Sequence, residues 1–421
     1  MKKRIYLLTI LFFTIFIINS VKIFAQGGSN YSIFGIGDII YGNSAAYQAI
    51  GGTQIAVPST NNINIINPAL WSIVNTTRIQ TGYRFNQNVI SNGSNELWQN
   101  NGSINGFASI FNFDTTKKIS ATILLQPMSV VNYFMSSPIE VSKEDETING
   151  INQYKGSGGL SSLIIGLSTK TLDWLYLGGS FNVIFGELQH NIYTIFKSDY
   201  TTNYTIKQVE DINAIGFKLG TYINPIEELG IGFFYEYIGK ANINNKKEYI
   251  YPISLGDVSQ PLINNSVISN FTKSTMPHYL GAGLSYTIRN KVMLSFDYLM
   301  VKFSNVNINK SINTKFRNLN KLSFGITKLG NSNYYAPIKE KFAYKAGAYY
   351  EQLYYTINEK NIDEIGISAG LQWPLSRTAQ IDIAFVFGQH GTTENYLLKE
   401  SFGKIIVDIS IGDIWFKKRK R

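Results

Sequence analysis

The sequence predicts an all-β fold: a transmembrane outer-membrane β-barrel of about 14 antiparallel strands with an N-terminal hatch, or plug. Three observations lead to this fold class. From Thr77 onward, apolar residues recur with a period of two, and short turns alternate with long loops. The chain is 44% hydrophobic but only 16% charged, whereas about 25% is usual in a soluble domain. Beyond the N-terminus, no stretch approaches the ~20 apolar residues of a spanning helix.

Residues 1–25 have the features of a secretory signal peptide. The basic residues Lys2, Lys3 and Arg4 precede an apolar run, and Ala25 is a small residue at the expected cleavage site. The alternative is an N-terminal membrane anchor, but the run is short for a stable span. We therefore expect export and a multi-pass barrel in the outer membrane of a Gram-negative bacterium.

Residues 26–76 are rich in Gly and Asn and show no clear periodicity, which predicts a compact hatch. The pair Gly51-Gly52 indicates backbone that lies very close to another surface. The motif Asn67-Pro68-Ala69 precedes the first strand, and Pro68 cannot donate a hydrogen bond to a sheet.

Residues 77–416 are predicted to form the barrel, because one face of each segment is apolar and the other carries Gly, Ser, Asn and acids. Greasy outer faces and polar inner faces are typical of a membrane barrel. The expected strands are 77–90, 102–113, 118–131, 156–170, 174–187, 210–223, 228–239, 278–289, 292–298, 317–328, 342–355, 365–373, 381–388 and 402–416.

The connections alternate in length, as in outer-membrane barrels with short periplasmic turns. Long loops are expected at 91–101, 132–155, 190–209 and 240–277. Trp174, Trp373 and Trp415 all fall at the short-turn end, where an aromatic girdle belongs. The final strand ends on aromatic residues, which barrel-insertion machinery commonly recognises.

The net charge of +10 does not indicate a nucleic-acid-binding protein. Four positive charges fall in the signal peptide and five in the C-terminal tail 417–421, so the remaining chain is nearly neutral. The tail either touches anionic lipid headgroups or is a solvated terminus. The chain has no Cys and no His/Asp/Glu run at ligand spacing, so neither a disulfide nor a metal site is expected.

Pro127 lies inside the third expected strand. A proline there removes a ladder donor and often marks a bulge or kink. The alternative is that the strand stops at Gln126.

Charged residues on the polar strand faces are the candidate lumen residues. They either guide a ligand carboxylate or pair with one another across the lumen. They are Lys218, Glu236, Asp297, Lys345, Glu351 and Asp382. The three histidines lie near expected loop boundaries and are interpreted as solvated, so we expect neither an enzyme nor a cofactor.

The Gly51-Gly52 segment, Asn67-Pro68-Ala69 just before the first strand, and the fourteen strands together resemble the FadL-type outer-membrane transporters. PorV-like secretion components resemble a branch of the same family. The first resemblance implies passive uptake of a hydrophobic small-molecule ligand, such as a long-chain fatty acid, with lateral release into membrane lipid near Pro127. The second implies a non-enzymatic barrel subunit of an outer-membrane secretion or assembly complex, with envelope protein partners on its long outer loops.

Overall fold

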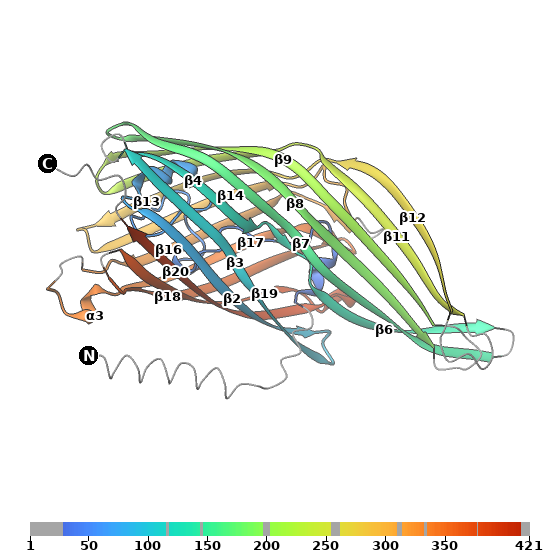
Figure 1. The fold of residues 1–421 in the computed structure, drawn as a ribbon. Coiled ribbons are helices and arrows are strands. Elements are labelled where there is room, and N and C mark those ends of the chain that lie inside the picture. Colours follow the sequence, from blue (N-terminus) through green and yellow to red (C-terminus); the bar gives the residue numbers. More distant parts are fainter. Residues whose placement is uncertain are drawn as a thin grey trace, which may run out of the picture.

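The computed structural model describes residues 28–114, 118–143, 146–196, 203–253, 262–309, 314–331, 335–376 and 378–413. The expected signal peptide, the basic tail and Trp415 lie outside the described residues. The described residues form one closed antiparallel barrel with the N-terminal segment inside it (Figure 1). None of their helices is long and apolar enough to cross a membrane.

Fourteen strands close the barrel in the described part of the chain, as expected from the sequence. They are β2 (Thr77–Ser91), β3 (Glu96–Asp114), β4 (Ile119–Pro127), β7 (Glu146–Leu172), β8 (Leu175–Phe196), β9 (Tyr204–Ile226), β10 (Leu229–Ile238), β13 (His278–Ile288), β14 (Val292–Lys302), β16 (Leu319–Lys328), β17 (Ala343–Ile357), β18 (Lys360–Pro374), β19 (Ala379–Gly391) and β20 (Lys399–Asp413). Pairing of β2 with β20 closes the cylinder. We call its two ends the short-turn end and the extended end.

The period of two in the sequence separates a lipid face from a lumen face. On β10, Phe233 and Tyr235 point outward and are 49% and 39% exposed, whereas Phe234 and Glu236 point inward and are 4% and 9% exposed. Neighbouring strands repeat this pattern and build an outer apolar belt. The belt includes Ile79, Leu167, Phe181, Ile215, Phe217, Leu219, Leu284, Phe296, Phe324, Ile367, Phe387 and Ile405. An apolar belt on a closed barrel is the surface that faces hydrocarbon in a membrane.

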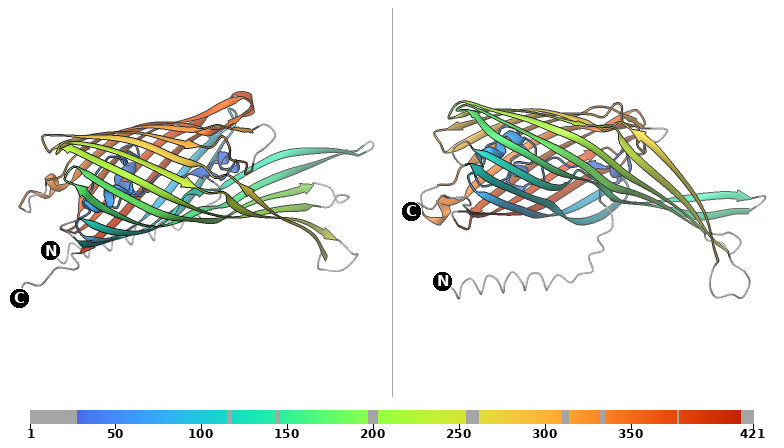
Figure 2. Two further views of the ribbon diagram at one scale, coloured as in Figure 1. Left: turned by 90° about the horizontal axis from the view of Figure 1, so that it is seen from above. Right: turned by 45° about the horizontal axis from the view of Figure 1, so that its top comes forward.

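At the extended end, six strands continue beyond the barrel as an open sheet (Figures 1 and 2). It consists of β6 (Tyr133–Lys143), the ends of β7, β8 and β9, and the hairpin of β11 (Ala241–Ile253) and β12 (Leu262–Ser274). We call it the extramembrane sheet. β11 pairs with β9 only as far as Asn213, whereas the outward apolar residues of β9 begin at Ile215. The β11–β12 hairpin therefore lies wholly beyond the apolar belt.

The expectation of loops at 132–155 and 240–277 is wrong for the described residues, which form β6, part of β7, β11 and β12 there. These strands do not face lipid. They therefore lack the strong apolar alternation by which the barrel strands are recognised in the sequence.

The N-terminal segment lies inside the barrel, consistent with a hatch, and is mostly buried. Its elements are η1 (Asn30–Ile33), β1 (Asp38–Ile39), α2 (Ala45–Gln48) and η2 (Pro68–Ile73). η1 lies near β6 and the β19–β20 loop at the extended end, and η2 lies on β7, β8 and β9 at the short-turn end. The segment thus runs through the lumen from one end to the other.

The third barrel strand leaves the wall after Pro127. β4 pairs with β3 only from Phe107↔Leu125 toward the short-turn end. The chain then turns inward, and β5 (Ser129–Val130) pairs with β1 of the hatch. Among the described residues, residues 96–106 of β3, the half toward the extended end, pair with no strand on the side away from β2.

The largest apolar core lies inside the barrel at the extended end. The loop at 303–309 folds inward there, and Phe303 stacks on Tyr354 with ring centroids 4.0 Å apart. Tyr354 donates its hydroxyl proton to the hatch carbonyls of Phe34 and Gly37, at 2.6 and 2.8 Å. The remaining short elements are β15 (Thr314–Phe316), α3 (Ile338–Lys341) and η3 (Glu394–Tyr396).

Candidate functional site

The hatch lies on glycines of the barrel wall. A Cβ on Gly178 would lie 2.4 Å from the Pro68 carbonyl carbon, and one on Gly220 would lie 2.2 Å from Asn67 Oδ1. Asn67 caps η2 by accepting the N–H of Ala69 at 3.1 Å, and its amide donates to the carbonyl of Thr221 on β9 at 3.1 Å. The Asn-Pro-Ala motif therefore contacts the barrel wall directly.

Gly51 and Gly52 adopt φ of 70° and 84°, which favours glycine. Gly51 donates its N–H to Ser368 Oγ at 2.8 Å, and a Cβ there would lie 2.6 Å from the carbonyl oxygen of Ala348. A Cβ on Gly347 would in turn lie 2.2 Å from the Gly51 nitrogen. Gly51 and Gly347 thus let the backbones of hatch and barrel lie too close for a side chain between them, whereas a Cβ on Gly52 would meet nothing nearer than 3.9 Å.

Two lumen carboxylates hold the hatch backbone. Asp297 Oδ2 accepts the N–H groups of Gln54 and Ile55 at 2.6 and 2.9 Å. Asp408 Oδ2 accepts the N–H of Ala45, which opens α2, at 2.6 Å. These hydrogen bonds satisfy buried backbone N–H groups, so they fix the hatch in the lumen.

The other candidate lumen charges all form ion pairs. Lys218 lies 3.0 Å from Glu236 and Lys345 lies 3.3 Å from Asp382. All four side chains are nearly buried, with at most 12% exposed. Glu351 pairs with Lys321 at 3.0 Å. These carboxylates and ammonium groups are therefore engaged inside the barrel in the described structure.

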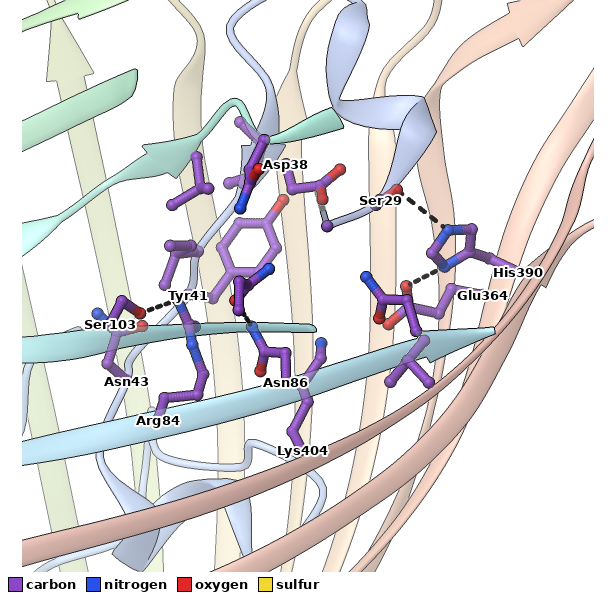
Figure 3. A pocket seen from close by; sticks show the side chains of 18 of the residues that line it. Ser29, Asp38, Tyr41, Asn43, Arg84, Asn86, Ser103, Glu364, His390 and Lys404 are labelled. Atoms are coloured by element: carbon purple, nitrogen blue, oxygen red, sulfur yellow. Dashed lines mark hydrogen bonds and ion pairs between the residues drawn. The ribbon is translucent and has the colours of Figure 1, made fainter. Parts of the chain in front are cut away.

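A cavity of about 450 Å³ lies between the hatch and the wall toward the extended end (Figure 3). Arg84 on β2 and Lys404 on β20 point into it, together with Asp38 of the hatch. Within the described residues, neither cation has a carboxylate at ion-pair distance. Lys404 Nζ lies 4.2 Å from the ring centroid of Phe402, and the buried Arg84 Nε has no acceptor. Burial raises the pKa of Asp38 to about 7. The cavity is therefore lined by charged and amide groups as well as by apolar ones.

Three titratable side chains form a row on adjacent strands, and two of them, Glu364 and His390, line the cavity. His390 Nδ1 lies 2.9 Å from Glu364 and His390 Nε2 lies 3.0 Å from Glu400. Glu400 also accepts the N–H of Asn30, which anchors η1. Ser29 Oγ lies 3.4 Å from His390 Nε2 (Figure 3).

Ser29, His390 and Glu364 resemble a hydrolase triad only in their residue types. Two carboxylate acceptors require two N–H donors on the imidazole, so His390 is doubly protonated and has no lone pair for the serine proton. The row Glu364–His390–Glu400 is suited to anchoring η1, because Glu400 accepts the N–H of Asn30. The interpretation of His390 as a solvated loop residue is wrong, because it is 7% exposed.

His190 is partly buried, and both of its ring nitrogens contact protein groups. Tyr133 Oη lies 2.7 Å from its Nδ1, and Asn309 Nδ2 lies 3.1 Å from its Nε2. Asn309 also donates to Glu210 at 2.9 Å and to the carbonyl of Gly35 at 3.2 Å. These contacts join the loop at 303–309, the wall and the hatch at the extended end.

Pro127 is the last residue of β4, one residue beyond the end proposed in the alternative interpretation. On the side away from β3, Pro127 is paired with Ser161 of β7. Met128 then donates its N–H to the carbonyl of Leu160 at 2.7 Å while the chain turns inward. Pro127 thus marks the place where the third strand leaves the wall.

Sequence reasoning missed Arg84, Glu364, His390, Glu400 and Lys404 as lumen groups. The period of two already places each of them on the polar face of its strand. Their proximity follows from register, because Glu364 lies opposite His390 and His390 opposite Glu400. Among the described residues, no group of three or more His, Asp or Glu side chains is arranged to hold a metal ion.

The extramembrane sheet carries large apolar side chains in contact with solvent. Phe271, Ile268 and Val267 on β12 are 82%, 57% and 51% exposed, and Val141 on β6 is 43% exposed. These residues lie beyond the apolar belt, so lipid does not cover them. Exposed apolar surface outside a membrane commonly marks a protein interaction site.

A family model named BamG matches residues 1–421, the whole chain. The chain belongs to the BamG family. No curated protein matches the sequence. The family assignment therefore rests on agreement over the full length rather than on an individual relative.

Solved structures show the same FadL-type barrel fold. The CymD monoaromatic hydrocarbon channel has a TM-score of 0.60 and 14% identity, covering 91% of this chain and 100% of that chain. The Pseudomonas putida toluene transporter TodX has a TM-score of 0.59 and 14% identity, with coverages of 89% and 99%. A Pseudomonas aeruginosa FadL homologue has a TM-score of 0.60 and 12% identity, with coverages of 90% and 99%. The BamG family chain is therefore a Gram-negative outer-membrane β-barrel.

Proposed function

We propose that this BamG family protein is a non-enzymatic barrel subunit of an outer-membrane secretion or assembly complex. The observation that carries the proposal is the extramembrane sheet, which exposes Val267, Ile268 and Phe271 to water beyond the apolar belt. A protein that works alone would gain nothing from such a surface, which favours aggregation unless it is covered. The partners would be other envelope proteins.

The lumen supports the same proposal. Hydrophobic ligands are bound in sites lined predominantly by apolar and aromatic side chains. Here the main cavity contains Arg84, Lys404 and Asp38, and buried ion pairs occupy the wall elsewhere. Desolvating these charges against a hydrocarbon would be costly.

Native mass spectrometry of the protein extracted from its own outer membrane in mild detergent tests the proposal. We expect a stable complex with other envelope proteins and an empty barrel. A monomer that carries a stoichiometric apolar ligand would contradict it. Extraction of an unrelated barrel under the same conditions controls for detergent-induced association.

The second candidate function is passive uptake of hydrophobic compounds such as long-chain fatty acids, with lateral release into the bilayer. Two observations favour it. The ladder between β3 and β4 stops at Phe107↔Leu125, beside Pro127. Proteins of the same fold include a monoaromatic hydrocarbon channel and a toluene transporter. Under this hypothesis Pro127→Ala, which restores a donor, lowers uptake of radiolabelled oleate by intact cells. Pro374→Ala, at the short-turn end of β18, is the matched control.

A further inference from the structure

The extramembrane sheet has two edge strands, β6 and β12. Among the described residues, β6 pairs only with β7, and β12 pairs only with β11. In the part of the chain that the structure describes, no backbone hydrogen bond reaches residues 266–273 of β12 from the side opposite β11. That side of β12 therefore presents a row of N–H and C=O groups to its surroundings.

The two edges differ in how they are protected against pairing. Natural edge strands carry prolines and charges that block the addition of another strand. β6 has these devices, with Pro138 and Glu140 in its middle and Lys143 at its end. β12 has one charge, Lys273 near its end, and its residues from Leu262 to Thr272 form a run of 11 without charge, proline or glycine.

The side chains of β12 match its open edge. Val267 and Phe271 lie on one face of the strand and Ile268 on the other, and all three are more than half exposed. β-Branched and aromatic residues are those that stabilise cross-strand pairs. An uncharged segment of this kind is expected to pair with another strand.

We propose that the free edge of β12 is a docking site for an extended segment of another envelope protein, which adds to the extramembrane sheet as its next strand. The inference rests on the proposed function, because it names how the barrel would hold a partner in a complex. The backbone of β12 would provide the hydrogen bonds. Val267 and Phe271 would select apolar side chains at alternate positions of the added strand.

The geometry favours a different protein over a second copy of this chain. β12 continues the antiparallel order of the barrel strands through β11 and β9, so its direction is fixed relative to the barrel. Copies inserted by one route point the same way across the membrane. Antiparallel pairing, the more stable kind, would require two β12 strands to point in opposite ways, which favours a strand from another protein.

Site-directed photocrosslinking in the native outer membrane tests this site. The full-length protein carries a photoreactive phenylalanine analogue at Ser269 on β12, or at Ser136 on the protected edge β6 as the matched control. We expect one adduct of defined mass from Ser269 and none from Ser136. The double variant Val267→Lys/Phe271→Lys should lose the Ser269 adduct, whereas Val141→Lys on β6 should keep it. Heat-modifiable gel mobility establishes that every variant is folded.

Hydrogen exchange distinguishes strand addition from contact through one face of the sheet. Strand addition predicts slower exchange of alternate amides within 266–273 in the purified complex than in the isolated barrel. A complex that persists with unchanged exchange and without a Ser269 adduct would overturn this inference and leave the proposed function standing. An adduct with the mass of two copies would also overturn it. The absence of any complex in the wild-type membrane would overturn the proposed function itself.

Discussion

Asp297 of β14 accepts the backbone N–H of Gln54 at 2.6 Å, and the same oxygen accepts the next N–H along the hatch. A residue in a membrane strand thus fixes a segment more than 240 positions away in the sequence. The contact is buried, since Asp297 is 4% exposed. It explains why an irregular, glycine-rich segment has one position in the lumen.

Asp297→Ala should loosen the hatch without unfolding the barrel. The change leaves two buried N–H groups without an acceptor, each at a cost of about 1–3 kcal/mol. We expect faster hydrogen exchange of residues 53–57 and unchanged exchange in the barrel strands. Asp211→Ala, on the exposed face of β9, serves as the control. Unchanged exchange in the hatch would show that the carboxylate does not hold it.

Gly220→Ala should destabilise the folded protein, because its Cβ would lie 2.2 Å from Asn67 Oδ1 and 2.6 Å from Pro68 Cδ. Overpacking of this kind costs about 1–3 kcal/mol. We expect the folded band on a heat-modifiable gel to disappear at a lower temperature. Gly179→Ala is the matched control, since its Cβ would meet the flexible Leu219 side chain at 3.3 Å and the Lys218 carbonyl oxygen at an ordinary 3.7 Å. Equal thermal shifts in both variants would contradict the assigned position of η2.

Glu236→Gln should be strongly destabilising because it leaves the buried Lys218 ammonium, now 3.0 Å from a carboxylate, without a counter-charge. Removing one partner of a buried pair typically costs about 3–5 kcal/mol. The double variant Lys218→Met/Glu236→Gln should recover most of that loss. Heat-modifiable mobility of the single and double variants gives the comparison. A double variant less stable than Glu236→Gln would show that Lys218 stabilises the lumen by other contacts.

The hatch around Asp38 should become less stable as pH rises from about 4 to about 7. Burial raises the folded-state pKa of Asp38 to about 7, whereas the pKa of an exposed Asp is about 4. The protonated form is favoured in the fold, so its contribution is full below the unfolded pKa and is lost as pH rises through the folded pKa. Hydrogen exchange of residues 34–42, corrected for intrinsic rates, measures this loss. Asp38→Asn should abolish the pH dependence.

Much of the architecture follows from the sequence, because a membrane barrel is a local pattern repeated many times. Each strand must present apolar residues to lipid at every second position, and segments such as Leu229–Ile238 show that alternation without any tertiary information. The lumen positions of Lys218 and Glu236 follow from the same alternation. The β11–β12 hairpin was missed because a strand outside the membrane has no such requirement.

The sequence by itself determined the strand number, the lipid and lumen faces, and a glycine-rich N-terminal segment with a recognisable Asn67-Pro68-Ala69 motif. Only the tertiary structure decided which groups meet. The row Glu364–His390–Glu400, the Gly178 and Gly220 contact under η2, and the open edge of β12 all depend on pairing register between strands. Register is set by the closure of the whole barrel around its hatch, and no single segment contains that information.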